Sequence, residues 1–252
     1  MKLKLWIWVC LLPCTILAQN NSRFEISYEK ITLDATHQQS NDNNIARYFD
    51  SIKKINDRIM GVTIGYCNST LENFRPESPL SNFLTDALLS FSDSVARANH
   101  EKPVDFSLLN FGGIRGTLKQ GPITVGNIFN ILFDNKIVIS SIQGSEVIKL
   151  IKKFGDKSCP AYSNIRIVYY NDKPISYTIG DQPIEENQIY RVATIDFLVF
   201  CNGDKIFENI SLINSYNTNT SMRDMVINYI QNKKNIDAKR DGRVNIQIQP
   251  RH

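Results

Sequence analysis

Residues 78–91 carry the strongest helical pattern in this sequence, and a short buried strand is expected after them. Ser78 is a preferred N-cap residue, and Pro79 suits the first helical position. Apolar residues then recur on one helical face, at Leu80, Phe83, Leu84, Ala87, Leu88 and Phe91. The apolar run at 104–109 is typical of a buried strand. These patterns predict a helix that is followed by a buried strand.

The rest of the sequence mixes helical and extended patterns. Helices are expected at residues 45–57, from Thr124 onward, at 145–154 and at 221–231. Strands are expected at 24–33, 58–67, 136–142, 164–170, 176–179, 189–194 and 243–249. Because helix–strand pairs and hairpin-like strands both occur, the expected fold is α+β, a mixed β-sheet with flanking helices.

The first nineteen residues have the layout of a secretory signal peptide. Two lysines open the segment, an apolar run spans residues 5–17, and Ala18 is a small residue before the expected cleavage site. The apolar run is short for a transmembrane helix. Cys14 would suit a lipoprotein anchor, but Pro13 fits that signal poorly. We therefore expect an exported protein, periplasmic or extracellular, with no transmembrane segment.

The predicted organisation has three parts. Residues 1–18 form the signal peptide, residues 19–43 an N-terminal strand and a polar connection, and residues 44–252 one domain. About 230 residues remain after cleavage, which is enough to bury a core as a single domain. Internal repeats and long low-complexity tracts are absent from the sequence.

Charge and metal-binding residue types limit the function. Cleavage after Ala18 takes the formal charge from +4 to about +2, which is too small for a basic nucleic-acid-binding face. The sequence has 3 histidines, and none belongs to a cluster of metal-ligand spacing. We therefore expect no catalytic metal centre and no cofactor in this chain.

Cysteines leave one question open. Cys67, Cys159 and Cys201 remain after cleavage, and none forms a C-x-x-C pair, which argues against a zinc site. An oxidising compartment would allow one disulfide among them, and the sequence does not indicate which pair.

The turn after the strand at 104–109 has residue types that suit an anionic ligand. Asn110 and Arg115 supply directed donors, and Gly112 and Gly113 let backbone amides approach a ligand closely. A guanidinium binds phosphate or carboxylate oxygens in a bidentate manner. A tight strand exit with a surface arginine explains the same pattern equally well.

Two further segments combine aromatic and polar residues. Phe133 follows the short helix that begins at Thr124, where an aromatic side chain commonly belongs to the core. Phe197 and Phe200 are expected at the end of an apolar strand, before a polar turn that contains Asp204. Each segment alone is explained by ordinary packing.

Taken together, these segments resemble the C-terminal domain of the 5′-nucleotidase family, which includes UDP-sugar hydrolases and 2′,3′-cyclic phosphodiesterases. The matching pieces occur in the family's order, at residues 77–82, 86–87, 110–115, 121–124, 132–133, 144–147, 194–204 and 241–244. They read ESPLSN, DA, NFGGIR, GPIT, LF, GSEV, TIDFLVFCNGD and DGRV. The resemblance spans roughly residues 44–248, and each piece is weak when it is taken alone.

The resemblance implies a nucleotide site. Asn110 and Arg115 would hold the sugar and phosphate side of a nucleotide, and Phe133 and Phe197 would sandwich the base. Asp204 would accept hydrogen bonds from the ribose hydroxyls. Stacking on an aromatic ring contributes about 1–3 kcal/mol per base and tolerates different bases.

Two further residues carry over, with departures from the family pattern. Gly113 belongs to the glycine turn, and Arg75 lies one position from the family's arginine ahead of the ESPLSN segment. Leu132 replaces a proline, and the family's G-N-D-G turn appears as C-N-G-D. The rewritten turn leaves Phe200 as an alternative to Phe197 for the second stacking ring.

Full-length members of this family place a two-metal metallophosphoesterase domain before the matching region. The resemblance therefore implies a nucleotide-recognising subunit that is not catalytically complete alone. A separate metallophosphoesterase chain, which carries a divalent metal pair, would be its partner. Two alternatives stay open: a stand-alone nucleotide- or nucleoside-binding module outside the cytoplasm, and a degenerate domain that only docks a partner.

Overall fold

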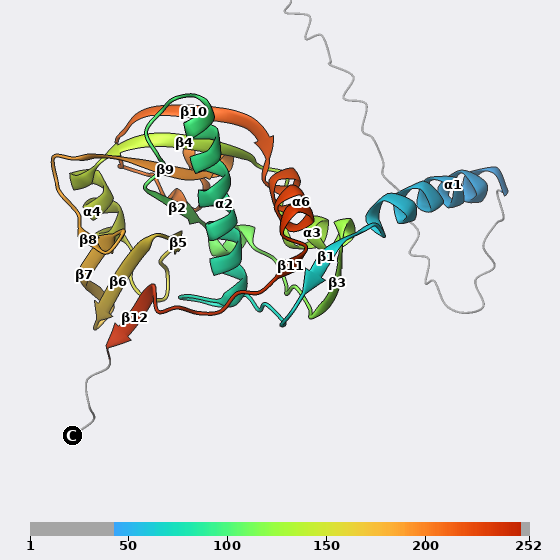
Figure 1. The fold of residues 1–252 in the computed structure, drawn as a ribbon, viewed down its shortest axis with the longest axis horizontal. Coiled ribbons are helices and arrows are strands. Elements are labelled where there is room, and N and C mark those ends of the chain that lie inside the picture. The colour runs from blue at the N-terminus through green and yellow to red at the C-terminus, as the bar shows by residue number, and fades with distance from the viewer. Residues whose placement is uncertain (1–42, 248–252) are drawn as a thin grey trace, which may run out of the picture. The chain divides into compact units, whose positions relative to one another are not determined.

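The computed structural model of the protein describes residues 43–247 (Figure 1). The helices are α1 (Asn43–Met60), α2 (Pro79–Ala98), α3 (Val125–Ile131), α4 (Gly144–Lys153), α5 (Asp196–Phe200) and α6 (Met222–Lys233). Short 3-10 turns lie at Phe111–Gly113 and Gly203–Lys205. The signal peptide expected at 1–18 and the strand expected at 24–33 lie outside the described residues.

The described strands form three sheets. The five-stranded sheet has the order β10-β4-β9-β2-β5, and β2 runs parallel to β9 whereas the other pairs are antiparallel. Two smaller sheets have the orders β11-β1-β3 and β12-β6-β7-β8. The five-stranded sheet comprises β10 (Leu212–Ser221), β4 (Lys136–Gln143), β9 (Ile189–Ile195), β2 (Phe106–Leu109) and β5 (Ala161–Ser163). The smaller sheets comprise β11 (Asn235–Ile236), β1 (Thr63–Cys67), β3 (Gly121–Thr124), β12 (Val244–Gln247), β6 (Ile165–Tyr170), β7 (Lys173–Ile179) and β8 (Gln182–Pro183). These mixed sheets with flanking helices confirm the predicted α+β class.

Helix α2 forms where the sequence predicts it. Ser78 and Ser81 cap its first turn reciprocally, with the Ser81 N–H donating to the Ser78 Oγ and the Ser78 N–H donating to the Ser81 Oγ. The helix lies across β2 and β5 and also packs on α6 (Figure 1). Leu80, Leu84 and Leu88 are fully buried in this contact, and each contributes about 2 kcal/mol of burial free energy.

The strand predicted at 58–67 begins later than expected. Helix α1 continues through Met60, and β1 starts only at Thr63. The Gly61 N–H donates to the Asp57 carbonyl at 2.9 Å, so the last helical turn closes on a glycine. Ile59 therefore belongs to the helix and not to the strand.

Residues 196–200 were predicted as the end of a strand, and this prediction is wrong. Strand β9 ends at Ile195, and residues 196–200 form the short helix α5. The Asp196 carboxylate accepts the backbone N–H of Phe197 at 2.8 Å, which supports a first helical turn. Phe197 and Phe200 therefore lie on a helix.

Strand β10 was missed by sequence reasoning. Its sequence, LINSYNTNTS, lacks a clear alternation of apolar and polar residues. It nevertheless pairs antiparallel with β4 at an edge of the five-stranded sheet. The Ser140 and Ser215 hydroxyls share a hydrogen bond of 2.8 Å across this pair.

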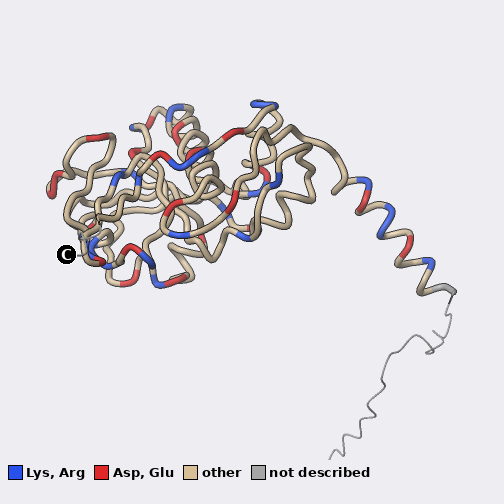
Figure 2. Tube along the Cα trace, turned by 90° about the horizontal axis from the view of Figure 1, so that it is seen from below, with Lys and Arg blue, Asp and Glu red and all other residues tan. Residues whose placement is uncertain are grey.

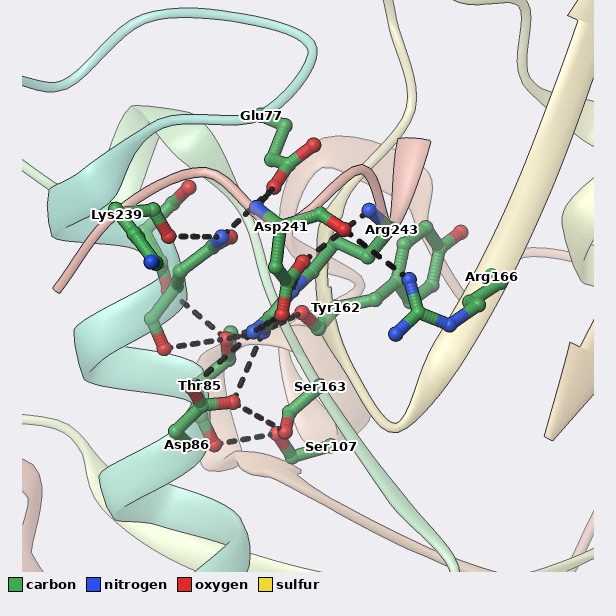
Figure 3. Close-up of polar contacts among 12 residues, drawn as sticks. Glu77, Thr85, Asp86, Ser107, Tyr162, Ser163, Arg166, Lys239, Asp241 and Arg243 are labelled. Atoms are coloured by element: carbon green, nitrogen blue, oxygen red, sulfur yellow. Dashed lines mark hydrogen bonds and ion pairs between the residues drawn. The ribbon is translucent and has the colours of Figure 1, made fainter. Parts of the chain in front are cut away.

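Arg243, just before β12, belongs to a polar network that ties the C-terminal segment to α2 (Figure 3). Its guanidinium donates to Asp86 at 2.9 and 3.1 Å, to Asp241 at 2.9 and 2.7 Å, and to the Tyr162 carbonyl at 2.8 Å. Burial alone would lower the pKa of Arg243, but the hydrogen bonds to Asp241 and Asp86 raise it. The hydrogen bond that Arg243 donates to Asp241 also lowers the pKa of Asp241.

Glu77 completes this network at the start of α2. Its buried carboxylate accepts the backbone N–H groups of Asp241 and Gly242 at 2.8 and 3.2 Å, and the Asn82 side-chain amide at 2.8 Å. The ESPLSN and DGRV segments therefore meet in space (Figure 3). They fasten the closing segment of the chain to the N-terminus of α2. We define Glu77, Asp86, Asp241 and Arg243 as the Arg243 network.

Within residues 43–247, Cys67, Cys159 and Cys201 are free thiols. Cys67 and Cys159 are buried, whereas Cys201 is exposed. Burial raises the pKa of the Cys159 thiol to about 12. The two buried cysteines therefore act as small apolar residues of the core.

Candidate ligand site

A hydrogen bond joins two of the predicted segments. The Asn110 side-chain amide donates to the Asp204 carboxylate at 2.7 Å, although 94 positions separate the two residues. Asn110 follows β2, and the α5 segment follows β9. Because β2 and β9 are parallel neighbours, their C-terminal ends lie at the same edge of the sheet. The fold itself thus brings these two segments together.

The glycine turn leaves room for this arrangement. A Cβ atom at Gly113 would lie 2.7 Å from the Asn110 Oδ1, so a larger residue would displace the Asn110 side chain. A Cβ atom at Gly112 would lie 3.4 Å from the Asp204 Oδ2, which is tight but tolerable. Asn110 is buried, and its Oδ1 atom has no hydrogen-bond partner among residues 43–247. A buried acceptor without a partner costs free energy and is a common feature of binding sites.

Arg115 lies over the ring of Phe133. The Arg115 guanidinium carbon is 4.7 Å from the ring centroid, which is a cation–π contact. The backbone places the pair, because the Arg115 N–H donates to the Ile131 carbonyl at 2.9 Å and Ile114 pairs with Leu132. Leu132 is buried and anchors the segment where the family has proline. Arg115 is exposed and has no ion pair within the described part of the chain, and Phe133 is 44% exposed.

Phe197 connects to the Asp204 turn through Gly203. A Cβ atom at Gly203 would lie 2.3 Å from the Phe197 ring, so the ring rests directly on the Gly203 backbone. Phe197 is 39% exposed, which leaves part of its ring accessible. Phe200, on the same helix, is 58% exposed. The Phe197 ring is thus the group nearest to Gly203, and this contact links Phe197 to the Asp204 turn.

The Asp204 turn has an unusual backbone. Asn202, Asp204 and Lys205 adopt left-handed φ angles of 52°, 48° and 53°. Such angles are rare outside glycine and persist where surrounding contacts hold them. Lys153, at the end of α4, supplies such contacts, because its ammonium donates to the backbone carbonyls of Lys205 and Glu208. The rewritten C-N-G-D sequence thus forms an ordered turn that presents an exposed Asp204 carboxylate.

One neighbour of the site was missed by sequence reasoning. Asn135 lines a small cavity together with Asn110, Gly113 and Phe133. It lies two positions after Phe133, at the junction with β4. A polar side chain directly before a buried strand was the available signal, and its proximity to Asn110 depends on the fold.

Arg75 occupies a different place from the other predicted residues. Its guanidinium lies 4.7 Å from the centroid of the buried Phe111 ring and donates to the Cys159 carbonyl at 2.6 Å. Phe111 follows Asn110 in the glycine turn. Arg75 therefore braces this turn, and its contacts do not include Phe133, Phe197 or Asp204 among the residues described.

A two-metal centre does not fit the described residues. Between Asn43 and Gln247, no group of three or more His, Cys, Asp or Glu side chains is arranged to hold a metal ion. In the same range, no helix has both the length and the apolar character that a membrane span requires.

The site can offer stacking, a guanidinium and a carboxylate. We define Asn110, Arg115, Phe133, Phe197 and Asp204 as the ligand cluster.

Comparison with known sequences places this geometry in context. Residues 59–212 match the family described as 5′-nucleotidase, C-terminal domain. Protein UshA of Yersinia enterocolitica is 25% identical over 186 residues, which cover 71% of this chain and 32% of that protein. The trifunctional nucleotide phosphoesterase protein YfkN of Bacillus subtilis is 26% identical over 177 residues, which cover 62% of this chain and 12% of that protein. The chain thus spans a third or less of these relatives.

Solved structures show the same fold. The 5′-nucleotidase precursor from Thermus thermophilus superposes with a TM-score of 0.68 at 20% identity, over 83% of this chain and 44% of that chain. The NAD nucleotidase of Haemophilus influenzae gives a TM-score of 0.61 at 17% identity, over 82% of this chain and 42% of that chain.

Proposed function

Because the chain belongs to the 5′-nucleotidase C-terminal domain family, we propose that it recognises a nucleotide for a 5′-nucleotidase-type phosphoester hydrolase. The Asn110–Asp204 hydrogen bond carries this proposal. It joins a turn with an exposed guanidinium to a turn with an exposed carboxylate, and each turn adjoins a partly exposed phenyl ring. A nucleotide has the three matching parts, which are a phosphate, a ribose and a base.

Each member of the ligand cluster has a role in this proposal. Phe133 and Phe197 stack on the base, which favours nucleotides of any base. Arg115 binds the phosphate through its guanidinium. Asp204 accepts hydrogen bonds from the ribose hydroxyls, since one carboxylate accepts several hydrogen bonds in addition to the one from Asn110.

Three other predicted residues support the cluster. Asn110 holds the Asp204 carboxylate through its side-chain amide. Gly113 leaves space for the Asn110 side chain, and Arg75 braces the turn through Phe111.

Hydrolysis itself is assigned to a partner. The described residues supply no metal-ligand set, so we place the divalent metal pair on a metallophosphoesterase chain. In this proposal the present chain binds the nucleotide and orients it, and a metal pair on the partner would supply the chemistry of hydrolysis. We also propose that the chain is exported, because residues 1–18 have a signal-peptide pattern. Cell fractionation that finds the protein only in the cytoplasm, with Met1 retained, would contradict export.

Calorimetry tests the recognition step directly. The purified chain is titrated with AMP and with adenosine in the absence of metal. We expect micromolar binding of AMP, and we expect Arg115→Ala to weaken AMP binding while adenosine binding stays unchanged, because adenosine lacks the phosphate. Lys119→Ala is the matched control, since Lys119 is an exposed cation in the same loop. Flat titrations for both ligands would refute nucleotide recognition.

An activity assay separates the partnered function from a stand-alone binding module. The chain is mixed with a purified metallophosphoesterase from the same organism and Mn²⁺, and AMP hydrolysis is measured. The partnered function predicts a rate above that of the phosphoesterase alone. AMP binding without any rate gain would support the stand-alone module instead.

A further inference from the structure

Helix α1 carries an exposed apolar stripe. Tyr48, Phe49, Ile52, Ile55 and Ile59 are between 43% and 64% exposed. The i, i+4, i+7 and i+11 spacing of Tyr48, Ile52, Ile55 and Ile59 places them on one helical face. We define these five residues as the α1 stripe.

An uncovered stripe of this size calls for a partner surface. An amphipathic helix of a folded domain normally buries its apolar face against the core. Large contiguous apolar patches on a protein surface mark interaction sites. Within the described residues, no side chain covers the stripe enough to bury any of its members.

Charged residues surround the stripe in a particular order. At about 100° per residue, Lys53 flanks one side of the stripe and Arg58 flanks the other. Asp50 and Asp57 fall on the opposite face of the helix. Figure 2 shows these basic and acidic positions alternating along α1. The rim of the stripe is therefore basic, and a complementary surface has an acidic rim.

This charge order argues against a second copy as the occupant. Two α1 helices paired antiparallel about Ile52 would bring both Lys53 side chains to the same flank, close to the centre of the pair. Like charges at that position oppose the association. The anchor spacing instead fits a helix that lies in an apolar groove of another protein.

The position of α1 in the chain favours the phosphoesterase partner as the occupant of the stripe. The stripe ends at Ile59, where the match to the 5′-nucleotidase C-terminal domain begins. The match covers 32% of the UshA relative, so about two thirds of that protein lies outside the match. We propose that the α1 stripe docks into an apolar groove with an acidic rim on the phosphoesterase partner. This inference rests on the proposed function.

The same helix end leads to the ligand cluster. The Val125 N–H donates to the Val62 carbonyl at 3.0 Å, and a Cβ atom at Gly126 would lie 3.1 Å from the Met60 carbonyl oxygen. The end of α1 therefore packs against the start of α3, and α3 leads directly to Leu132 and Phe133. A partner seated on the stripe is thus one short helix away from a stacking ring.

Purified components test the docking surface. Each exported metallophosphoesterase of the source organism is purified and titrated with the full chain, with Ile52→Lys and with Phe49→Ser. One of these enzymes is expected to form a 1:1 complex, which each stripe variant weakens by about 30-fold or more. Lys54→Ser, which lies opposite the stripe, is the matched control and is expected to change the affinity by about 2-fold at most. Circular dichroism and AMP titration verify that the variants remain folded.

Other occupants give distinct results. A complex that tolerates both stripe variants, or no complex with any of the enzymes, overturns the proposal. Light scattering that finds a dimer of the chain alone, lost in Ile52→Lys, assigns the stripe to a second copy. Stripe-dependent flotation with vesicles of equal parts phosphatidylcholine and phosphatidylglycerol assigns it to a membrane surface, which also overturns the proposal. A stripe-dependent complex combined with flat AMP titrations retains the docking surface and removes nucleotide recognition.

Discussion

The Arg243 network and the ligand cluster use similar residues in opposite ways. Both contain an arginine and an aspartate, and in both a hydrogen bond joins residues from distant parts of the sequence. In the network, the Arg243 side chain is 9% exposed, and it donates to two carboxylates and a backbone carbonyl. In the ligand cluster, Arg115 and Asp204 are exposed beside two partly exposed rings. The first arrangement satisfies its polar groups internally, whereas the second leaves them accessible to a ligand.

This difference teaches which motif residues act as scaffold. The ESPLSN and DGRV segments belong to the same motif series as the glycine turn, yet Glu77 binds the backbone of the DGRV segment and Arg243 binds Asp241. Changes in the Arg243 network should therefore alter stability and leave affinity unchanged in the folded protein. Changes in the ligand cluster should alter affinity and leave stability nearly unchanged.

The largest expected effect comes from Arg243→Met. The substitution removes a buried guanidinium that donates to Asp86, Asp241 and the Tyr162 carbonyl, and we expect the loss of these hydrogen bonds to lower the free energy of unfolding by about 3 kcal/mol. Urea denaturation followed by circular dichroism measures it. Arg97→Met is the control, because the Arg97 side chain is 70% exposed and its pair with Asp93 lies outside the network, so stability should change by about 0.5 kcal/mol or less. Equal midpoints for the two variants would show that the network is not a scaffold.

The next effect separates the two phenylalanines of α5. Phe197→Ala should weaken AMP binding by about 5- to 150-fold, the equivalent of about 1–3 kcal/mol of stacking. Phe200→Ala should bind AMP like the unaltered chain, because the ring nearest to Gly203 in the Asp204 turn is that of Phe197. Calorimetry with both variants decides between the rings. Loss of binding in Phe200→Ala alone would reverse the assignment.

A smaller effect is expected from Gly203→Ala. The added Cβ would collide with the Phe197 ring, which is partly exposed and can rotate away. We expect AMP affinity to fall by about 5-fold, with a loss of about 1 kcal/mol or less in the free energy of unfolding. Gly112→Ala, whose Cβ would make a tolerable contact, is the comparison. A drop in stability without a change in affinity would place Gly203 in the scaffold.

The smallest expected effect is a pH dependence of stability, which arises from Asp241 in the Arg243 network. The pKa of Asp241 is lowered from its ordinary value of 3.8, chiefly by the hydrogen bond from Arg243. Its stabilising contribution is therefore present above pH 3.8 and is lost as the pH falls through the lower folded value. Urea midpoints measured between about pH 6 and pH 3 should fall less steeply for Asp241→Asn than for the unaltered chain. Parallel profiles for the two proteins would contradict this linkage.

Burial of Asp156 changes the free energy of unfolding with pH in the opposite direction. Desolvation, and then the neighbouring Asp172, raise the pKa of Asp156 above its ordinary value. Its contribution is present at low pH and is lost as the pH rises through the raised value. Asp156→Asn should therefore be measured beside Asp241→Asn, so that the two opposing profiles are separated.

The sequence predicted those elements whose causes are local. Ser78, Thr124 and Ser221 are N-cap residues at the helix starts where they were expected, and Lys136 begins its strand. The later start of β1 and the helical form of residues 196–200 were missed, since short apolar runs suit both periodicities. Strand β10 was missed because its polar residues are held by pairing with β4 rather than by their own pattern.

The residues of the candidate site were identified as types, and their arrangement was not. Nothing in the spacing of Asn110 and Asp204 indicates a hydrogen bond, because the parallel pairing of β2 with β9 brings them together. The bracing contacts of Arg75 and the proximity of Asn135 likewise depend on tertiary structure. Their roles toward a nucleotide stay predictions that the variants above can test.

The exposed thiol of Cys201 gives this protein a built-in labelling handle. It is the accessible one of the three described cysteines, and it lies in the loop that leads to Asp204. A maleimide dye should therefore attach at one position without any engineering, and its fluorescence would report on events at the rim of the cluster. In an oxidising environment, small disulfides would react with the same sulfur and block the dye. Each preparation should therefore be reduced before it is labelled and titrated.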